Sequence, residues 1–130
     1  MKTGKFLLTL AGAALFAATQ VQAQVKIGVV SSATGPTAFV GIPQRNTIPL
    51  LPDKVGDTRI EYIFVDDGSD PTASVKAAQQ LITEKRIDAL IGPSGSPNAM
   101  GVLSFMAEAE TPMLAPVGTA AVVLPMDDRS

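Results

Sequence analysis

Four short apolar runs lie downstream of the N-terminal segment, and each of them ends in a loop rich in Gly, Ser, Asp or Pro. The runs cover residues 25–30, 59–65, 87–91 and 113–115. β-Branched residues dominate the first run, and the second alternates Ile60, Tyr62 and Phe64 with the intervening positions. Short apolar runs between turn residues are typical of β-strands. The pattern therefore predicts four strands.

The clearest helix signal lies between the second and third predicted strands. Asp70 supplies a side chain that can cap a helix, and Pro71 suits the first helical position. Val75, Ala78 and Ile82 follow at helical spacing. These features predict a helix that begins directly after Asp70.

Two further segments have helical features. Ser96-Pro97 repeats the order of cap and proline, and apolar residues then occupy nearly every side of the segment 96–109. Such a helix is expected to be buried on more than one face. Between residues 41 and 55, Pro43, Pro49 and Pro52 predict that any helix is short or kinked.

The alternation of strands and helices predicts an α/β fold, with a parallel sheet and helices on both faces. In such a sheet the ligand lies beyond the carboxyl ends of the strands, where the strand order reverses. Four loops follow the predicted strands and are the candidate site. They cover residues 31–40, 66–70, 92–98 and 116–120.

Residues 1–23 have the order of a secretory signal peptide. Lys2 and Lys5 precede an uncharged apolar run over residues 6–18, and Val21-Gln22-Ala23 offers small residues at the cleavage subsites. The apolar run is too short for a stop-transfer helix, and no Cys follows it to accept a lipid. We therefore expect cleavage after Ala23 and export to the periplasm.

Composition removes several classes of chemistry. The chain of 130 residues has no His and no Cys, which excludes a Ser-His-Asp triad, a cysteine nucleophile, a disulfide and zinc sites built from thiolate or imidazole. The 10 Lys and Arg against 12 Asp and Glu give a formal net charge of -2, so the chain has no basic footprint for nucleic acid. Its length suits one modest core.

Enzymatic motifs are incomplete in the candidate loops. The run Gly92-Pro93-Ser94-Gly95-Ser96 has only part of a nucleophile elbow, because Ser96 replaces the last glycine and no histidine is available. Neither a P-loop nor a G-x-G-x-x-G turn occurs. Asp66 and Asp67 could hold Mg²⁺ for phosphotransfer, but the first and third strands end in no further acid, so we expect a solvated strand end. We expect no enzyme activity, no metal and no cofactor.

The loop at Gly92 has the features of a site for a small anion. It leads into the predicted helix at Ser96, where unpaired N–H groups and the helix dipole favour a carboxylate. Ser94 and Ser96 add hydroxyl donors, and Thr119 follows the neighbouring strand. The alternative is that Ser96 and Thr119 merely cap the helices that follow them.

Six segments after the signal peptide carry a family resemblance. They are residues 25–30, 34–36, 66–71, 89–93, 107–113 and 115–119. In their order and separations the chain resembles the substrate-binding protein of branched-chain amino acid ABC transporters. The resemblance implies a type I periplasmic binding fold, in which two α/β lobes joined by a hinge close on a ligand.

The resemblance also implies site residues. It places ligand contacts on two loops, at Ser94, Gly95, Ser96, Val117, Gly118 and Thr119. It assigns the carboxylate and ammonium groups of an amino acid to Ser96 and Thr119. Several relatives have an aromatic residue just before the glycine of the first loop, where this chain has Val40. Val40 is therefore expected to shape the specificity pocket.

Members of this family are considerably longer than this chain. We therefore expect residues 24–130 to be an incomplete N-terminal lobe of the type I periplasmic binding fold, with the second lobe absent. One lobe alone cannot enclose a ligand, which predicts weak binding. An unfinished sheet also predicts exposed apolar surface on the segment 96–109 and on the fourth strand.

The function implied is that of a periplasmic solute-binding receptor for ABC-type import of branched-chain or related amino acids or small carboxylates. Its expected partners are the small-molecule ligand and the membrane permease of the transporter, with no nucleic acid. The alternative is the ligand-sensing domain of a signalling receptor with the same fold. An export signal with no following anchor favours the transport role.

Overall fold

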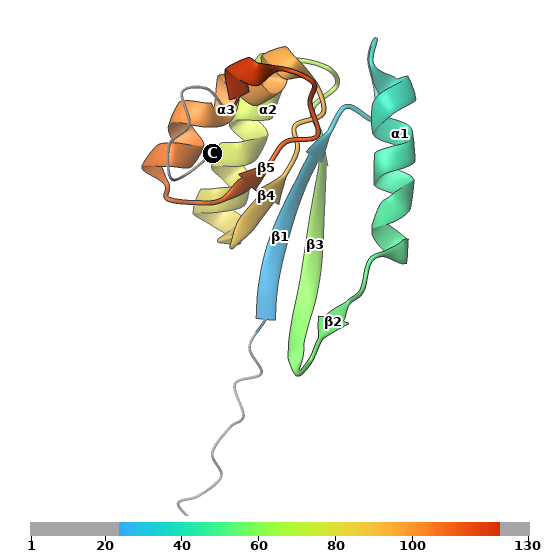
Figure 1. Ribbon diagram of the computed structural model, residues 1–130, viewed down its shortest axis with the longest axis vertical. Coiled ribbons are helices and arrows are strands. Elements are labelled where there is room, and N and C mark those ends of the chain that lie inside the picture. Colours follow the sequence, from blue (N-terminus) through green and yellow to red (C-terminus); the bar gives the residue numbers. More distant parts are fainter. Residues whose placement is uncertain (1–23, 123–130) are drawn as a thin grey trace, which may run out of the picture.

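A five-stranded sheet forms the centre of the fold (Figure 1). The computed structural model describes residues 24–122, so the predicted signal peptide and the last residues of the chain lie outside the described residues. The strands are β1 (Gln24–Ser31), β2 (Lys54–Val55), β3 (Thr58–Asp66), β4 (Ala89–Ile91) and β5 (Met113–Leu114). Their order across the sheet is β2-β3-β1-β4-β5, and all neighbouring pairs except β2 and β3 are parallel.

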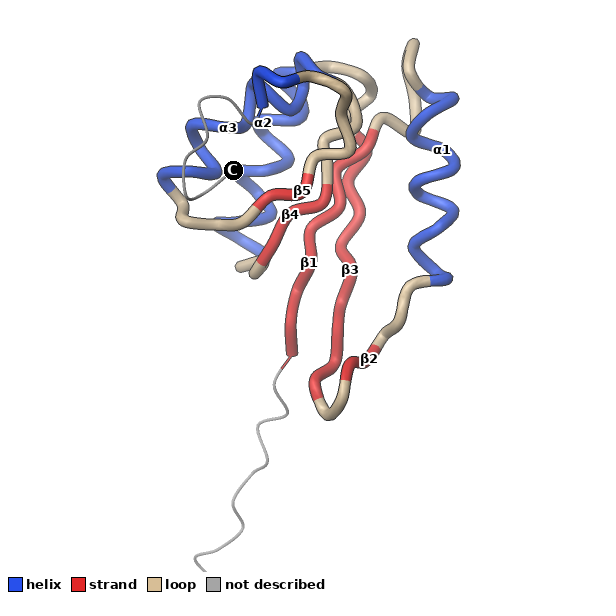
Figure 2. The backbone as a smooth tube through the Cα atoms, in the orientation of Figure 1, coloured by secondary structure: helices blue, strands red, loops and turns tan. Residues whose placement is uncertain are grey.

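Helices cover both faces of the sheet. Figure 2 shows α1 on one side and α2 and α3 together on the other. The helices are α1 (Ala38–Thr47), α2 (Pro71–Gln80) and α3 (Ser96–Glu108), with the short helical turns η1 (Ile48–Leu50), η2 (Leu81–Lys85) and η3 (Ala120–Val122). The predicted α/β architecture is confirmed. All four predicted strands are present. The third, β4, is shorter than predicted, and Ile87 lies before it as a buried core residue.

The predicted start of α2 is confirmed, whereas that of α3 is wrong by one residue. The Asp70 carboxylate accepts the N–H groups of Thr72 and Ala73, at 2.6 and 3.2 Å. In α3 the cap is Gly95, without a side-chain cap bond, and Ser96 is the first helical residue. Pro97 is compatible with a helix that starts at Ser96 or at Pro97 itself, because the first helical positions all lack an intrahelical partner for their N–H group.

The expectation that any helix within residues 41–55 is short is confirmed, because α1 has 10 residues and ends at Thr47, but its start was not predicted. Helix α1 begins earlier, at Ala38, and continues through Pro43 to Thr47. Proline removes one N–H bond, to the carbonyl group four residues earlier, which is that of Phe39. Both Phe39 and Pro43 are exposed to solvent.

The hairpin formed by β2 and β3 was not predicted from the sequence. Strand β2 pairs antiparallel with the start of β3, as Val55 with Thr58, across Gly56-Asp57. Gly56 has a φ of 59°, in the left-handed region that favours glycine. A Gly-Asp pair between two residues of strand character is a hairpin signal and could have revealed the turn.

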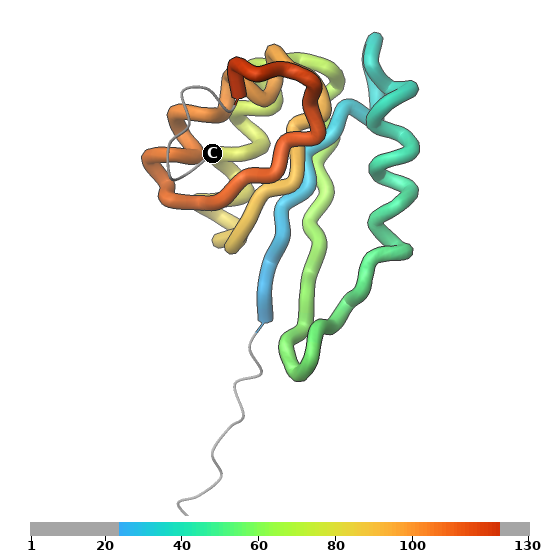
Figure 3. The backbone as a smooth tube through the Cα atoms, viewed as in Figure 1, coloured from blue at the N-terminus to red at the C-terminus, as the bar shows by residue number. Residues whose placement is uncertain are grey.

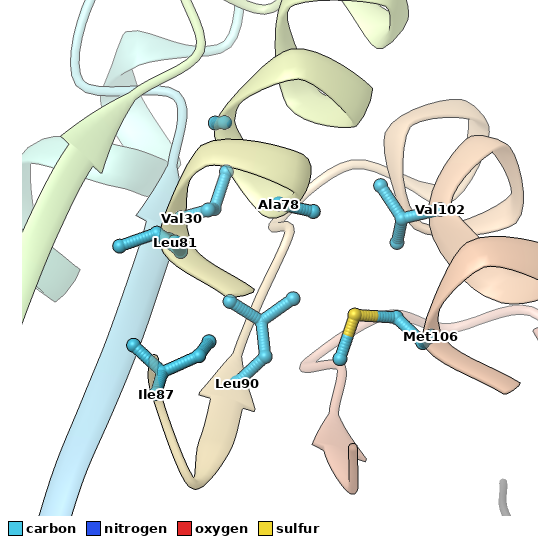
Figure 4. Close-up of a cluster of buried hydrophobic side chains, with 8 residues drawn as sticks. Val30, Ala78, Leu81, Ile87, Leu90, Val102 and Met106 are labelled. Carbon is cyan, nitrogen blue, oxygen red and sulfur yellow. The ribbon is translucent and has the colours of Figure 1, made fainter. Parts of the chain in front are cut away.

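The hydrophobic core lies between the sheet and the pair α2 and α3 (Figure 4). Val30 and Leu90 of the strands face Leu81 at the end of α2 and Val102 and Met106 of α3. Burial of each of these large side chains stabilises the fold by about 1.5–3 kcal/mol. This single cluster holds both helices on one face of the sheet.

Helix α3 is buried on one face only, contrary to expectation. Its buried residues are Asn98, Ala99, Val102 and Met106, and Met100 on another side is 50% exposed. Leu114 of β5 is 69% exposed. The prediction of exposed apolar surface on this helix and strand is confirmed.

Within residues 24–122, no helix combines the length and apolar character needed to cross a bilayer.

A buried carboxylate joins the strand ends to the helices. Asp67 follows β3 and is only 2% exposed, so the expected solvated strand end is wrong at this residue. Its Oδ1 accepts the Ser32 hydroxyl at 2.6 Å and the Ser69 N–H at 3.0 Å. Its Oδ2 accepts the Ser74 hydroxyl at 2.7 Å and Nδ2 of Asn98 at 2.9 Å. The Asp67 carboxylate therefore connects the loops after β1 and β3 with helices α2 and α3 through hydrogen bonds.

We expect Asp67→Ala to lower the free energy of unfolding by roughly 3 kcal/mol or more, because it leaves several buried donors without an acceptor. Urea unfolding followed by circular dichroism measures this loss. Asp57→Ala is the control, since Asp57 forms only an exposed ion pair with Lys54 at 3.7 Å. Equal unfolding midpoints for the two variants would show that the buried carboxylate contributes little.

Candidate functional site

The strand order reverses between β1 and β4, which are parallel neighbours. Helix α1 leaves the end of β1 toward one face of the sheet, and α3 leaves the end of β4 toward the other (Figure 3). The loops that follow the strands therefore diverge at this edge. In α/β sheets this divergence forms the crevice in which ligands bind.

The loop between β4 and α3 carries three of the predicted site residues. Ser94, Gly95 and Ser96 are all partly exposed, so the start of α3 is not sealed inside the protein. Neither the N–H nor the hydroxyl of Ser96 bonds another residue in the described part of the chain. Helix α3 has 13 residues, and the dipole of such a helix favours negative charge at its first turn.

The loop after β5 carries the next three predicted residues. Val117 and Thr119 are partly exposed and Gly118 is exposed. Strand β5 is the next neighbour of β4, and the Gly92 N–H donates to the Leu114 carbonyl at 2.8 Å, so the two loops begin side by side. Thr119 also caps η3, because its Oγ1 accepts the Ala121 N–H at 3.4 Å. This bond leaves the Thr119 hydroxyl proton available for a ligand.

Val40 lies on α1, next to the point where this helix touches the sheet. The following residue, Gly41, is buried, and a Cβ atom there would overlap the Ser32 carbonyl group. Only glycine therefore permits this approach. Val40 is partly exposed, and Phe39, one position earlier, is 77% exposed.

Two polar residues beside Ser94, Ser31 and Gln44, were not predicted as site residues. Gln44 of α1 accepts the hydroxyl of Ser31, the last residue of β1, at 2.7 Å. Ser94 lies within hydrogen-bond distance of both, at 2.8 Å from the Ser31 hydroxyl, and it also donates to Gln44 Oε1. Gln44 falls four residues after Val40, which puts both on one face of a helix. That spacing could have revealed Gln44 had the helix been predicted to start before residue 41.

Three acids at this end of the sheet accept hydrogen bonds from the chain itself. Asp67 is buried in the network described above, and Asp70 caps α2. Asp66 accepts the N–H groups of Ala33, Thr34 and Gly68 at 2.9, 3.2 and 3.0 Å. Within residues 24–122, no cluster of three or more acids is placed to hold a metal ion.

The pKa of Asp66 is lowered by its loop. Partial burial, the largest single effect, raises the pKa, but the hydrogen bonds from Gly68, Thr34 and Ala33 together outweigh it. The pKa therefore lies below the ordinary value of 3.8. The ionised carboxylate holds the loop after β1 against the loop after β3.

Residues 24–126 match the family described as periplasmic binding protein. The chain belongs to this family. A curated relative, Leu/Ile/Val-binding protein homolog 6 of Brucella abortus, is 30% identical over 95 residues, which cover 69% of this chain and 24% of the relative. The members it resembles are binding proteins and not enzymes, as expected from the incomplete motifs.

Solved structures of binding proteins share the fold. An extracellular ligand-binding receptor from Rhodopseudomonas palustris HaA2 is 41% identical, with a TM-score of 0.79, over 83% of this chain and 30% of that one. An ABC transporter solute-binding protein from R. palustris in complex with 4-hydroxybenzoate is 28% identical, with a TM-score of 0.69, over 77% of this chain and 29% of that one. The chain thus spans 24–30% of the length of these proteins.

We expect Asp66→Asn to remove part of the acid sensitivity of the fold. Because folding lowers the pKa of Asp66, its charge stabilises the folded chain above pH 3.8, and this contribution is lost as the pH falls through the lowered pKa. Urea unfolding midpoints measured across the acid range should therefore fall less steeply for Asp66→Asn than for the unmodified chain. Asp53→Asn, at an exposed loop position, is the control. Parallel curves for all three proteins would refute the expectation.

Proposed function

We propose that the chain binds a small organic carboxylate, as part of a solute-binding receptor that serves an ABC importer. The observation that carries the proposal is the chemistry at the carboxyl ends of β1 and β4, where the loops that follow these strands diverge. Hydroxyl, amide and helix N–H donors converge there, while Asp66, Asp67 and Asp70 already accept hydrogen bonds from the chain itself. Such a surface favours an anion over a cation.

Ser94, Gly95 and Ser96 would hold the carboxylate at the start of α3. The dipole of this helix and the Ser96 N–H offer positive charge, and the hydroxyls of Ser94 and Ser96 add donors. Val117, Gly118 and Thr119 would approach the ligand from the adjacent loop, with the Thr119 hydroxyl as a further donor. Val40 would contact the apolar part of the ligand from α1.

The relatives suggest two ligand types that share a carboxylate. One resembles Leu/Ile/Val-binding proteins, and another was solved with 4-hydroxybenzoate. An amino acid also needs an acceptor for its ammonium group, and none of the predicted ligand contacts carries a carboxylate. We therefore place aromatic carboxylates such as 4-hydroxybenzoate first among the ligands to be tested, and branched-chain amino acids second.

The location and partner follow from the same proposal. Export through residues 1–23 would bring the chain to the periplasm, where it would present its ligand to a membrane permease. These statements rest on the sequence pattern of that segment and on the ABC transporter relatives.

We expect 4-hydroxybenzoate to shift the backbone resonances of Ser96 and Gly118 in NMR titrations of the chain, with a Kd on the order of 1 mM, because the described site is open to solvent. The matched compound 4-hydroxybenzyl alcohol, which lacks the carboxylate, should cause no saturable shift. L-Leucine tests the second ligand type.

Ser96→Ala should weaken carboxylate binding about tenfold, which corresponds to the loss of roughly 1.4 kcal/mol. Ser104→Ala is the matched control, because Ser104 is exposed on the same helix, two turns away from its start. Equal shifts from the alcohol and the carboxylate, or shifts that map away from the loops after β4 and β5, would contradict the proposed site.

A further inference from the structure

We propose that Gln44 and Ser94 form a paired donor that takes one oxygen of the ligand's carboxylate, while Ser96 takes the other, and that Gln44 thereby selects acids over their neutral amides. This inference rests on the proposed function and adds a specificity-determining residue to it. It starts from the three side chains that meet where α1 crosses the end of β1.

These three side chains form more close contacts than they have protons to make hydrogen bonds. Ser31, Ser94 and Gln44 Oε1 form three close pairs. The two serine hydroxyls supply only two protons, and Gln44 Oε1 supplies none. At any moment one pair is therefore not joined by a proton, so the arrangement can release one hydroxyl without leaving an acceptor empty.

Ser94 holds the proton that can be released. Ser31 is 1% exposed and donates to Gln44 at 2.7 Å, so its bond persists when a ligand arrives. Ser94 is partly exposed, and its hydroxyl can turn from Ser31 or Gln44 to a ligand. The exchange replaces one hydrogen bond of Ser94 with a bond to the ligand, and Gln44 Oε1 stays satisfied because it keeps its bond from Ser31.

Gln44 supplies the second donor. With Oε1 held by Ser31, the amide group is oriented and its Nε2 is directed away from this serine. The two N–H groups of Nε2 bond no other residue in the described part of the chain, and the side chain is partly exposed. An oriented amide presents donors at a defined point and loses little freedom on binding.

The position of this pair relative to α3 determines what it binds. Ser94 is two residues before Ser96, so a carboxylate held at the start of α3 would have its second oxygen beside Ser94 and Gln44. A carboxylate presents acceptors on both oxygens, whereas a primary amide presents an NH₂ group on one side. That NH₂ group would meet the donors of Gln44, and the amide would be rejected.

The test compares 4-hydroxybenzoate with 4-hydroxybenzamide, by NMR titration of the chain and its variants. The unmodified chain should prefer the acid by tenfold or more, and the side-chain NH₂ resonances of Gln44 should shift with the acid. Gln44→Glu keeps an acceptor for both serines but replaces the donor with an anion. It should bind the acid at least tenfold more weakly and bind the amide equally well or better.

Two further variants separate this role from charge and from folding. Arg45→Gln makes the same change in charge at an exposed neighbouring position, and it should keep the preference for the acid within about threefold. Ser94→Ala should weaken acid binding several-fold and leave the thermal midpoint unchanged, because Ser31 still donates to Gln44. If Gln44→Glu does not fold, the Ser94→Ala variant still tests the donor pair.

The outcomes distinguish this inference from the proposed function. If the unmodified chain binds neither 4-hydroxybenzoate nor L-leucine, the proposed function fails, and the donor pair fails with it. If the unmodified chain binds 4-hydroxybenzoate but Gln44→Glu or Ser94→Ala binds it equally well, or the Gln44 resonances do not move, the donor pair alone is refuted.

Discussion

One buried carboxylate links the loops and helices at the carboxyl end of the sheet, and within residues 24–122 it forms no ion pair with a Lys or Arg. Asp67 is buried, and its carboxylate is stabilised entirely by hydroxyl and amide donors from the loops after β1 and β3 and from α2 and α3. A buried carboxylate is tolerated only when its oxygens are satisfied in this way. The same bonds fix the ends of two strands and the start of α3, and these are the parts from which the candidate site is built.

Close backbone approaches place α1 beside this arrangement. Gly41 allows the helix to lie against Ser32, and Gln44, one turn later, reaches Ser31 and Ser94. A glycine and a glutamine thus couple the helix on one face of the sheet to the loop that feeds the helix on the other.

The sequence predicted the elements better than the contacts between them. Apolar runs located the strands, and Asp70-Pro71 located α2, because these signals depend on neighbours in the chain. The burial of Asp67 and the reach of Gln44 depend on residues more than 30 positions away or on another element, so no local pattern reports them. The start of α1 at Ala38 was missed, because Pro43 lies inside this helix and not at its beginning.

The cross-linking of the strand-end loops also affects how the protein can move. Asp66 and Asp67 join the loops after β1 and β3, Asp67 bonds Asn98 of α3, and Ser94 bonds Ser31. Loops tied at so many points cannot fold over a ligand individually. Any larger movement at this end of the sheet therefore displaces the loops and helices together, as one rigid body, as in hinge motions.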